Sequence, residues 1–421
     1  MKNVTTNIKV LLFWDKTSWY ALGALTPSLQ KANLSCEIIR GDVVTSIHKQ
    51  IAQGYHVIYG ESARITTLDS LENRLKMINE QISSPQLTIV IGGSYASGNP
   101  QRILEMGADY VIIGEGEVTF PELIHTLASK EAGDISFFLL PGIVFLDKKG
   151  DFVQTSSRAR IDLNEHCPYL DSEIFPLHPP IELMRGCAFR CRFCQVPYMY
   201  GNPRFRSIET ITKIVEHYVR HFTPLKRSVD IRFIAPNSLG YMEKKRGQPN
   251  YDALNDLLKR LSRFEIRIFF GTFPSEIRPE YITEEIVFLF DKVNNRQISV
   301  GFQSGSDRVL SAMRRGHSVA DGLRANDLMV SQGITPIFDF ILGVPSETTV
   351  EQWQTLSLIR ELGRNARVRL HYFMPLPGTP WENSQPALLD SEIQSEIGRL
   401  AKAKIIMGAF VKQFQIAFQD K

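Results

Sequence analysis

Three cysteines lie within eight residues of one another, because Cys187, Cys191 and Cys194 form a C-x3-C-x2-C triplet. Thiolates select zinc, Cu(I) or iron-sulfur clusters. A four-iron cluster is usually held by four cysteines, so a triplet without a nearby fourth cysteine leaves one iron open to a substrate or a second cofactor. The spacing therefore predicts a [4Fe-4S] cluster with one open coordination position.

A structural zinc ion is the main alternative, and it needs four ligands, commonly cysteines and histidines at paired spacings. No histidine lies between Glu182 and Glu216, and the other cysteines, Cys36 and Cys167, are isolated in the sequence. The loop also carries cations and no acid, and cationic neighbours favour the thiolate over the thiol. We therefore favour the cluster over zinc. The cations are Arg185, Arg190, Arg192, Arg204 and Arg206.

The triplet, with the bulky apolar Phe193 directly before its third cysteine, resembles the signature loop of the radical S-adenosylmethionine (SAM) superfamily. The resemblance implies that the open iron chelates the amino and carboxylate groups of SAM. It also implies that Phe193 lies beside the SAM molecule.

Composition limits the class of protein. The 421 residues suffice for two or three domains, and 43% hydrophobic and 22% charged residues are typical of a globular protein. A net charge of +3 is too small to indicate a nucleic-acid partner. The longest apolar run, Phe137 to Leu146, is too short to span a bilayer, and the start of the sequence lacks the pattern of a signal peptide. With few cysteines, we expect a cytoplasmic protein without a membrane contact.

In the first third of the chain, short apolar runs alternate with amphipathic helical patterns, which indicates alternating strands and helices. This alternation predicts a doubly wound parallel sheet. In such sheets a ligand lies outside the carboxyl ends of the strands, where two glycine-rich peptides, starting at Gly92 and Gly114, would allow close backbone approach. The predicted strands are 8–14, 36–40, 56–59, 87–91 and 110–113.

Residues 5 to 130 resemble the cobalamin-binding, Rossmann-like domain that precedes many radical SAM domains. The resemblance rests on Gly92-Gly93 through Pro100, on 104–111 and on Gly-Glu-Gly-Glu at 114–117. The segment 15–20 lacks the histidine that supplies a cobalt ligand in mutases and methionine synthase. The resemblance therefore implies cobalamin with its dimethylbenzimidazole tail held away from cobalt. The implied cobalamin residues are Thr17, Ser18, Gly92, Gly93, Ser94, Tyr95, Gly114, Glu115, Gly116 and Glu117.

From residue 181 to about 385, five further segments follow in the order of strands two to six of a partial (β/α)6 radical SAM barrel; they are 231–238, 268–271, 300–307, 338–348 and 372–380. The resemblance places Asn237 near the methionine amino group of SAM and Val344 near adenine. It places Gln303, where the family commonly has Glu, and Ser304 near the ribose or carboxylate. Polar groups at strand ends favour a functional role, because parallel barrels gather their sites there.

Two further segments complete the predicted organisation. Residues 131–180 are rich in proline and are expected to form a linker that contains a small hairpin, 143–146 with 152–154. Residues 386–421 are expected to be helical, with an amphipathic helix from Glu392 to Gln419 that docks on the barrel. The predicted domains are therefore 1–130, 131–180, 181–385 and 386–421.

The resemblance implies a cobalamin-dependent radical SAM methyltransferase. One SAM gives a 5′-deoxyadenosyl radical and a second gives its methyl group through methylcobalamin, while a flavodoxin or ferredoxin supplies electrons. Other corrinoid-dependent radical chemistry, a domain that no longer binds cobalamin, and a non-enzymatic corrinoid or iron-sulfur carrier remain as alternatives. Methylthiotransferases are disfavoured, because their amino-terminal domain brings three more clustered cysteines, which Cys36 and Cys167 cannot supply.

No catalytic acid or base is assigned from the sequence, and the substrate, a small molecule or a peptide, stays open. Aromatic and basic residues are expected at the mouth of the barrel, where they would suit lipids, peptides, pterins or antibiotic intermediates. They are Tyr198, Tyr200, Arg204, Arg206, His371 and Tyr372.

Overall fold

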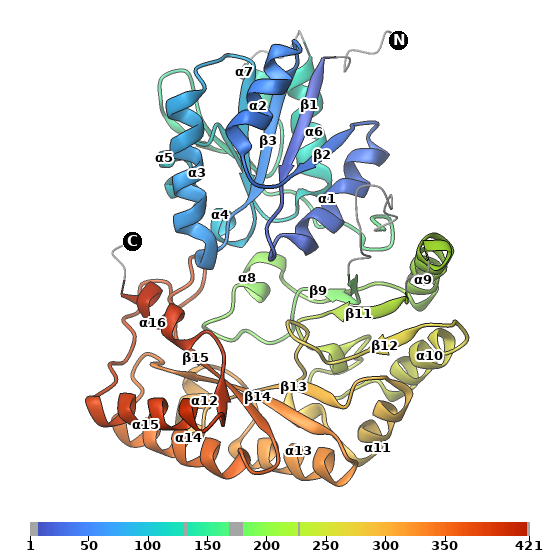
Figure 1. The fold of residues 1–421 in the computed structure, drawn as a ribbon, viewed down its shortest axis with the longest axis vertical. Helices are drawn as coiled ribbons and strands as arrows, with labels where there is room; N and C mark the ends of the chain where they lie inside the picture. The colour runs from blue at the N-terminus through green and yellow to red at the C-terminus, as the bar shows by residue number, and fades with distance from the viewer. Residues whose placement is uncertain (1–6, 130–133, 168–179, 226–227, 419–421) are drawn as a thin grey trace. The chain divides into compact units, whose positions relative to one another are not determined.

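The computed structural model describes residues 7–129, 134–167, 180–225 and 228–418. The chain divides into two compact units, residues 1–179 and 180–421. Each unit is an α/β structure built on parallel strands, as Figure 1 shows. In the described part of the chain, no helix is both long enough and apolar enough to cross a membrane.

The first unit is built on a seven-stranded sheet in the order β2-β1-β3-β4-β5-β6-β7. Its first five strands are parallel and confirm the five strands predicted from the sequence. The order 2-1-3-4-5 is that of flavodoxin-like doubly wound sheets, in which the ligand lies where the strand order reverses, between β1 and β3. The strands are β1 (Ile8–Phe13), β2 (Cys36–Ile39), β3 (His56–Ser62), β4 (Leu87–Gly92), β5 (Tyr110–Ile112), β6 (Ile143–Leu146) and β7 (Phe152–Gln154).

Helices cover both faces of this sheet, because the strands are apolar on both sides. Leu11 packs on one face with residues of α2, α3 and α5, whereas Leu12 packs on the other face with residues of α1 and α6. Successive strand residues thus enter different cores, as a parallel sheet requires. The helical segments are α1 (Trp19–Lys31), α2 (Val43–Ala52), η1 (Ile65–Thr67), α3 (Leu68–Gln81), α4 (Ser94–Gly98), α5 (Pro100–Glu105), α6 (Gly116–Ala128) and α7 (Asp134–Phe138).

The predicted hairpin is confirmed as β6 and β7, which pair antiparallel. It falls within the segment 131–180 that the sequence assigned to a linker, yet β6 pairs antiparallel with β5 and extends the first sheet. Ile143 and Val144 are fully buried, and the burial of these apolar side chains stabilises the attachment of the hairpin to the sheet. The prolines 168, 176 and 179 lie outside the described residues.

The second unit contains the partial barrel. One parallel sheet has the order β12-β11-β8, and a second has the order β13-β14-β15-β16. A single parallel bridge joins Ile277 to Val300 of β13. Strands β11 to β14 overlap the segments predicted for barrel strands two to five, whereas β15 ends at Tyr372, the first residue of the segment predicted for strand six. The strands are β8 (Ile181–Glu182), β9 (Met184–Arg185), β10 (Arg204–Phe205), β11 (Asp230–Ile234), β12 (Arg267–Phe269), β13 (Gln297–Gln303), β14 (Thr335–Leu342), β15 (Arg367–Tyr372) and β16 (Ile406–Met407).

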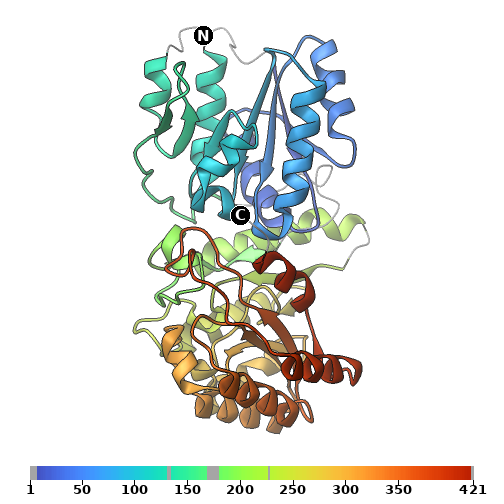
Figure 2. The same ribbon diagram turned by 90° about the vertical axis from the view of Figure 1, so that its left-hand side faces the viewer.

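Helices form the outer layer of this unit, and Figure 2 shows the orange and red ones, α13 to α15, along one side of it. Two of them start with a capping box, in which Ser318 and Thr348 accept from the third residue of the helix. The helical segments are α8 (Val196–Tyr200), α9 (Ile208–Phe222), η2 (Thr223–Leu225), η3 (Ser238–Gly240), α10 (Tyr251–Leu261), η4 (Pro279–Tyr281), α11 (Glu284–Val287), η5 (Phe288–Lys292), α12 (Asp307–Ala312), α13 (Val319–Ser331), α14 (Thr349–Leu362), α15 (Ser391–Lys402) and α16 (Phe410–Ala417).

The single amphipathic helix predicted for 392–419 is wrong. The segment forms α15 and α16 with the short strand β16 between them, and β16 pairs with β15. Lys404 and Gly408 have φ of +58° and +121°, which a helix does not allow. The predicted apolar spacing survives within α16, where Phe410 and Phe414 contact the ring of Tyr372.

Candidate functional site

The cysteine loop leaves β9 through a sharp turn at Gly186, which has φ of +85°. A Cβ at this position would lie 2.4 Å from the carbonyl oxygen of Asn202 and 2.7 Å from that of Gly201, so no other residue fits without moving backbone. The next residue, Cys187, donates its N–H to the carbonyl of Gly201 at 2.9 Å. The hairpin of β9 and β10 thus holds the start of the loop.

The middle of the loop rests on the segment between α12 and α13. The N–H of Arg192 donates to the carbonyl of Met313 at 3.1 Å, and the thiol of Cys191 lies 3.7 Å from the carbonyl of Arg314. Among the residues that the structure describes, no three His, Cys, Asp or Glu side chains converge closely enough to hold a metal ion.

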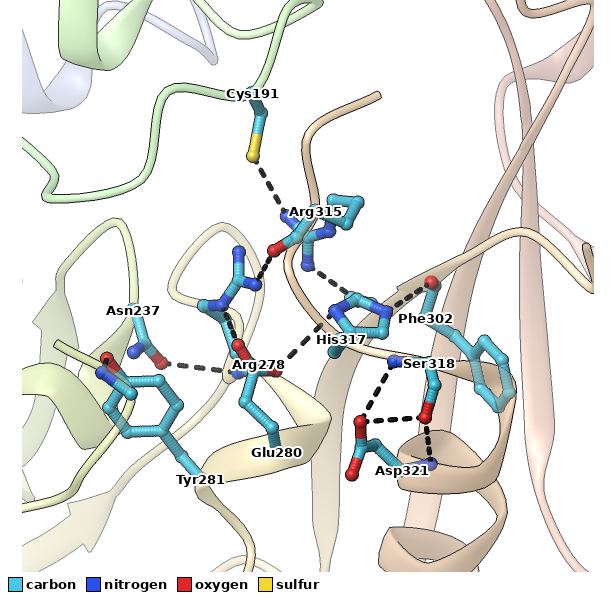
Figure 3. A network of polar contacts seen from close by, with 12 residues as sticks. Cys191, Asn237, Arg278, Glu280, Tyr281, Phe302, Arg315, His317, Ser318 and Asp321 are labelled. Atoms are coloured by element: carbon cyan, nitrogen blue, oxygen red, sulfur yellow. Dashed lines mark hydrogen bonds and ion pairs between the residues drawn. The ribbon is translucent and has the colours of Figure 1, made fainter. Parts of the chain in front are cut away.

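A buried arginine, Arg315, faces the cysteines, and Figure 3 shows its contacts. Its guanidinium donates to the sulfur of Cys191 at 3.7 Å and to the carbonyl of Gly301 at 2.7 Å, and its Nε has no partner. A buried cation with an unused donor suits the negative charge that a thiolate-bound cluster brings. Arg315 lies outside the sequence-predicted set of arginines, because the fold and not the sequence brings it to the cysteines.

The predicted arginines around the loop play different parts. Arg185 forms two hydrogen bonds with the carboxylate of Glu182, and Arg206 is buried and donates to the carbonyl of Glu182. Neither is an uncompensated cation beside the thiols. Arg190 is exposed at the outer side of the loop. The guanidinium of Arg315 contacts the sulfur of Cys191, and the charges of Arg278 and Arg315 both favour the thiolate of Cys187.

Burial dominates the protonation of the thiols. It raises the pKa of Cys187, and together with the negative charge of Cys191 it raises the pKa of Cys194 to about 12, whereas Arg315 acts in the opposite direction. The mutual influence of the three groups places them in one cluster of interacting side chains. Because metal ligands must be deprotonated, binding of iron releases protons here. The three cysteines, brought together beside a buried cation, fit a thiolate-bound cluster.

Asn237 lies at the end of β11, where the sequence expects a SAM contact. It is 2% exposed, its side-chain oxygen accepts the N–H of Arg278 at 3.2 Å, and its Nδ2 has no partner in the described part of the chain. The bond to Arg278 fixes the orientation of the amide, so the free group is a donor. A donor matches the carboxylate of SAM rather than its amino group.

Gln303 ends β13 with φ of +79°, a conformation that non-glycine residues rarely adopt. The strand register shifts between Gly301 and Gln303, which turns the side chain over Gly301. A Cβ on Gly301 would lie 2.6 Å from Nε2 of Gln303 and 3.1 Å from both Arg315 and Glu276. Three polar side chains thus meet above one glycine, at a strained strand end of the kind found in active sites.

The other predicted SAM residues have different surroundings. Ser304 is fully buried, and its hydroxyl accepts the N–H of Ser306 and lies 3.4 Å from the hydroxyl of Thr355, so the protein itself already uses this group. Phe193 and Val344 pack in one apolar cluster that also contains Trp381. The structure therefore brings these last two predicted residues together.

Three polar residues near this strand end, Glu276, Asp339 and Arg369, were missed by the sequence analysis, which singled out only their neighbour His371. Asp339 is 2% exposed and accepts from Arg369 at 2.6 Å and from His371 at 3.1 Å. Glu276 is partly buried, and desolvation and the charge of Asp339 raise its pKa. Neighbouring residues of a strand face opposite sides, and this alternation could have distinguished His371 from Tyr372. His371 contacts Asp339, whereas Tyr372 faces the other side and donates to the carbonyl of Ala387. The expectation that both residues face the barrel mouth is therefore wrong for Tyr372.

The ligand edge of the first unit carries an ion pair at the point where the strand order reverses. Asp15 follows β1 and accepts from Arg64, which follows β3, at 2.8 and 2.9 Å. Asp15 also accepts from the backbone of Thr17 and Ser18, so these two predicted cobalamin residues form a tight turn at the start of α1. Burial opposes ionisation of Asp15, but the bonds from Thr17 and the charge of Arg64 outweigh it and lower its pKa.

The two glycine-rich loops meet beside this pair. The hydroxyl of Ser97 donates to the carbonyl of Gly93 and accepts the N–H of Gly114 at 2.9 Å, so it joins the two loops. Gly93 is required by packing, because its Cβ would lie 2.5 Å from the hydroxyl of Ser62, whereas Gly114 faces open space with φ of +77°. Sequence analysis included Ser97 in the first loop but assigned it no role.

The remaining predicted cobalamin residues divide between the edge and the interior. Glu115 accepts the N–H of Ile161 at 2.9 Å. Tyr95 and Glu117 are 3% and 6% exposed and so lie inside the unit. The predicted residues that are only partly buried along the edge are Gly92, Gly93, Ser94, Gly114, Glu115 and Gly116.

Two buried donors at this edge, Nε1 of Trp14 and Nε of Arg64, have no hydrogen-bond partner among the residues that the structure describes. Buried polar groups are normally hydrogen-bonded, so these donors fit a ligand rich in acceptors. Gly114 leaves space for such a ligand close to the main chain. The edge therefore fits an amide-rich corrin, with no histidine in the segment 15–20 to coordinate cobalt.

Comparison with known families agrees with this division of the chain. Residues 18–124 match the model of the B12 binding domain, and residues 181–359 match the model of the radical SAM superfamily.

Curated relatives are distant. A protein of Methanocaldococcus jannaschii named as a methylthiotransferase is 28% identical over 62% of this chain and 55% of its own length. The tRNA-2-methylthio-N(6)-dimethylallyladenosine synthase of Aromatoleum aromaticum is 28% identical over 71% of this chain and 62% of its own length. The chain thus spans just over half to under two thirds of the length of these two relatives.

Solved structures share the fold of both units. The radical SAM methyltransferase TsrM from Kitasatospora setae, with cobalamin and a [4Fe-4S] cluster bound, has a TM-score of 0.69 and 18% identity, covering 89% of this chain and 77% of that one. The cobalamin-dependent SAM radical enzyme OxsB, with aqua-cobalamin and SAM bound, has the same TM-score and identity, covering 96% of this chain and 56% of that one.

Proposed function

This chain combines a B12 binding domain with a domain of the radical SAM superfamily, and we propose that it is a methyltransferase that passes a methyl group from SAM, by way of cobalamin, to a carbon atom. Its cofactors are a [4Fe-4S] cluster, SAM and cobalamin. Together they supply a 5′-deoxyadenosyl radical, which removes hydrogen from carbon, and a transferable methyl group. The observation that carries the proposal is the presence of both fitted cofactor sites in one chain.

The chain's own residues have distinct tasks in this reaction. Cys187, Cys191 and Cys194 would hold three irons and leave the fourth for SAM. Arg315 stabilises the negative charge of the thiolates from a buried position 3.7 Å from Cys191. The free Nδ2 of Asn237 would bind the carboxylate of SAM.

The interior acids and histidine are suited to orienting the substrate. Methylation replaces C–H by C–CH3, and the hydrogen leaves with 5′-deoxyadenosine, so the balance of this reaction requires no base in the protein. Asp339 and Gln413 together hold both ring nitrogens of His371, at 3.1 and 3.2 Å, so the imidazole can offer the substrate a fixed ring surface rather than a free nitrogen. Orientation of this kind is the contribution that proteins make to cofactor chemistry.

A specific observation separates this proposal from methylthio transfer, the activity named for two sequence relatives. Outside the triplet, the chain has only Cys36 and Cys167, which cannot supply three further clustered ligands. Cys36 is partly buried in the first unit, and this burial raises its pKa, whereas the thiol of Cys167 donates to the carbonyl of Asn164. Methyl transfer is supported by the structural likeness to TsrM, which is named as a methyltransferase.

The test uses anaerobic protein loaded with cluster and cobalamin, reduced with titanium citrate and given SAM with a trideuterated methyl group. We expect 5′-deoxyadenosine and the labelled methyl group on the corrinoid, measured by mass spectrometry. Cys191→Ala should abolish 5′-deoxyadenosine, whereas the matched control Cys36→Ala should retain it. Formation of 5′-deoxyadenosine with all label remaining in SAM and methionine would contradict methyl transfer and favour other radical chemistry.

A further inference from the structure

A cavity of about 830 Å³ opens on the outer side of the cysteine loop. Phe189 and Arg190, which lie between the first two cysteines, form one wall. The other walls come from Arg246, Glu280 and the segment between α12 and α13, including Arg314. All of these residues belong to the second unit, so the cavity is a feature of that unit alone.

The rim of this cavity is positively charged. Arg190, Arg246 and Arg314 are exposed, and none of them forms an ion pair within the described part of the chain. Arg246 instead lies 5.5 Å from the ring centre of Phe189 and follows two exposed lysines at 244 and 245. Unpaired exposed arginines around one opening attract an acidic partner over a distance set by the ionic strength.

The acids near the cavity cancel only part of this charge. Glu280 is paired with Arg278 at 2.5 Å, whereas Asp307, which accepts only the backbone N–H of Val319 at 2.7 Å, offsets one of the three exposed arginines. His317, which also lines the cavity, adds no charge, because burial and the nearby arginines lower its pKa to about 2.

A short polar route joins the cavity to the cluster ligands. Figure 3 shows Glu280 bonded to Arg278, whose guanidinium donates to the backbone carbonyl of Arg315. The side chain of Arg315 reaches the sulfur of Cys191. The guanidinium of Arg278 also stacks on the ring of Phe189, with its carbon 3.5 Å from the ring centre, so Arg278 is in direct contact with a residue of the cavity wall. Because electron transfer rates fall steeply with distance, a redox group placed in this cavity is well located to reduce the cluster.

We propose that this cavity and its arginines form the docking surface for an acidic flavodoxin that reduces the cluster. The inference rests on the proposed function and adds the place where the electron enters. One electron leaves the fully reduced flavin and enters the cluster, the flavin keeps its proton, and no bond is made or broken. The concave opening suits a carrier that presents the edge of its prosthetic group, and the contact of such transient redox pairs is small and steered by charge.

The test measures binding first, with fluorescently labelled, oxidised flavodoxin and the full chain as purified. We expect the dissociation constant to rise about tenfold between about 0.05 and 0.3 M salt. The double variant Lys244→Glu, Arg246→Glu, which changes two exposed cations and leaves the support of the cysteine loop intact, should weaken binding by about tenfold or more at low salt, since each reversed charge turns an attraction into a repulsion. The matched control is Arg364→Glu, an exposed arginine after α14 at the opposite ends of the barrel strands, which should leave binding unchanged.

A second measurement separates this proposal from the proposed function. Formation of 5′-deoxyadenosine with titanium citrate should be equal in the wild type and the double variant, whereas formation with reduced flavodoxin should fall in the double variant. Unchanged binding in the double variant, an equal loss in the control, or tighter binding of an equally acidic ferredoxin would overturn the docking proposal. Absence of 5′-deoxyadenosine with titanium citrate would overturn the proposed function instead, while the binding result still decides the docking surface.

Discussion

Replacing Gly186 by alanine should disable the cysteine loop while leaving the rest of the fold in place. Alanine at φ of +85° costs about 1–2 kcal/mol. Its Cβ would also lie 2.4 Å from the carbonyl oxygen of Asn202, so the hairpin must open, and the bond from Cys187 to Gly201, worth about 1 kcal/mol, is lost. The total cost of about 3 kcal/mol lowers the fraction of molecules whose cysteine loop has the geometry that binds the cluster about 100-fold.

The matched control is Gly333→Ala, in the turn between α13 and β14. Gly333 also has a left-handed backbone, with φ of +67°, but a Cβ there meets nothing within 4 Å. This variant therefore carries the backbone strain without the collision. Both variants should retain the far-ultraviolet circular dichroism of the wild type.

The assay is iron bound per chain after anaerobic reconstitution against a competing chelator. We expect strongly reduced iron in Gly186→Ala and wild-type iron in Gly333→Ala. Wild-type iron in Gly186→Ala, or an equal loss in both variants, would refute the reasoning that the turn at this position holds the ligand loop.

Three further changes test other parts of the structure. Burial raises the pKa of Glu347 to about 8, so its folded form binds more protons than its unfolded form and stability should fall as pH rises from about 4.5 to 8; Glu347→Gln should flatten this fall in thermal unfolding. Asp15→Asn removes the 2.8 Å ion pair with Arg64 and should weaken the binding free energy of the corrinoid by about 1–3 kcal/mol, which would be measured as less cobalt retained after desalting. Gly322→Ala should lower the midpoint of thermal unfolding of the second unit by several degrees, because its Cβ would lie 2.1 Å from the ring of Phe302.

The strands of both units could be predicted from the sequence because buried parallel strands are apolar on both faces. The segments 8–14 and 87–91 became β1 and β4 with bounds within one residue. The hairpin after Pro141-Gly142 was also predicted, but its attachment to β5 was not, since pairing between distant strands leaves no local pattern. The break of the last helix at β16 was missed because the apolar spacing continues on both sides of it.

The candidate site was predictable where one short motif carries it and not where the fold assembles it. The three cysteines and Gly186 lie in one segment, whereas Arg315 reaches Cys191 across 124 residues. Asp339 and His371 lie on neighbouring strands and become partners only through the register of β14 and β15. Even so, Asn237 and Gln303 were found as strand-end polar groups, and the structure gives each an unusual feature, a free buried donor and a left-handed backbone.

The central claim is that one chain holds both a cluster and a corrinoid. The most direct test is to quantify iron and cobalt per chain, with an ultraviolet-visible spectrum, in anaerobically reconstituted protein that has been given hydroxocobalamin and then desalted. We predict about four irons and one cobalt per chain. Iron without cobalt would contradict a corrinoid-dependent reaction, and zinc without iron would contradict the assignment of the cysteine triplet itself.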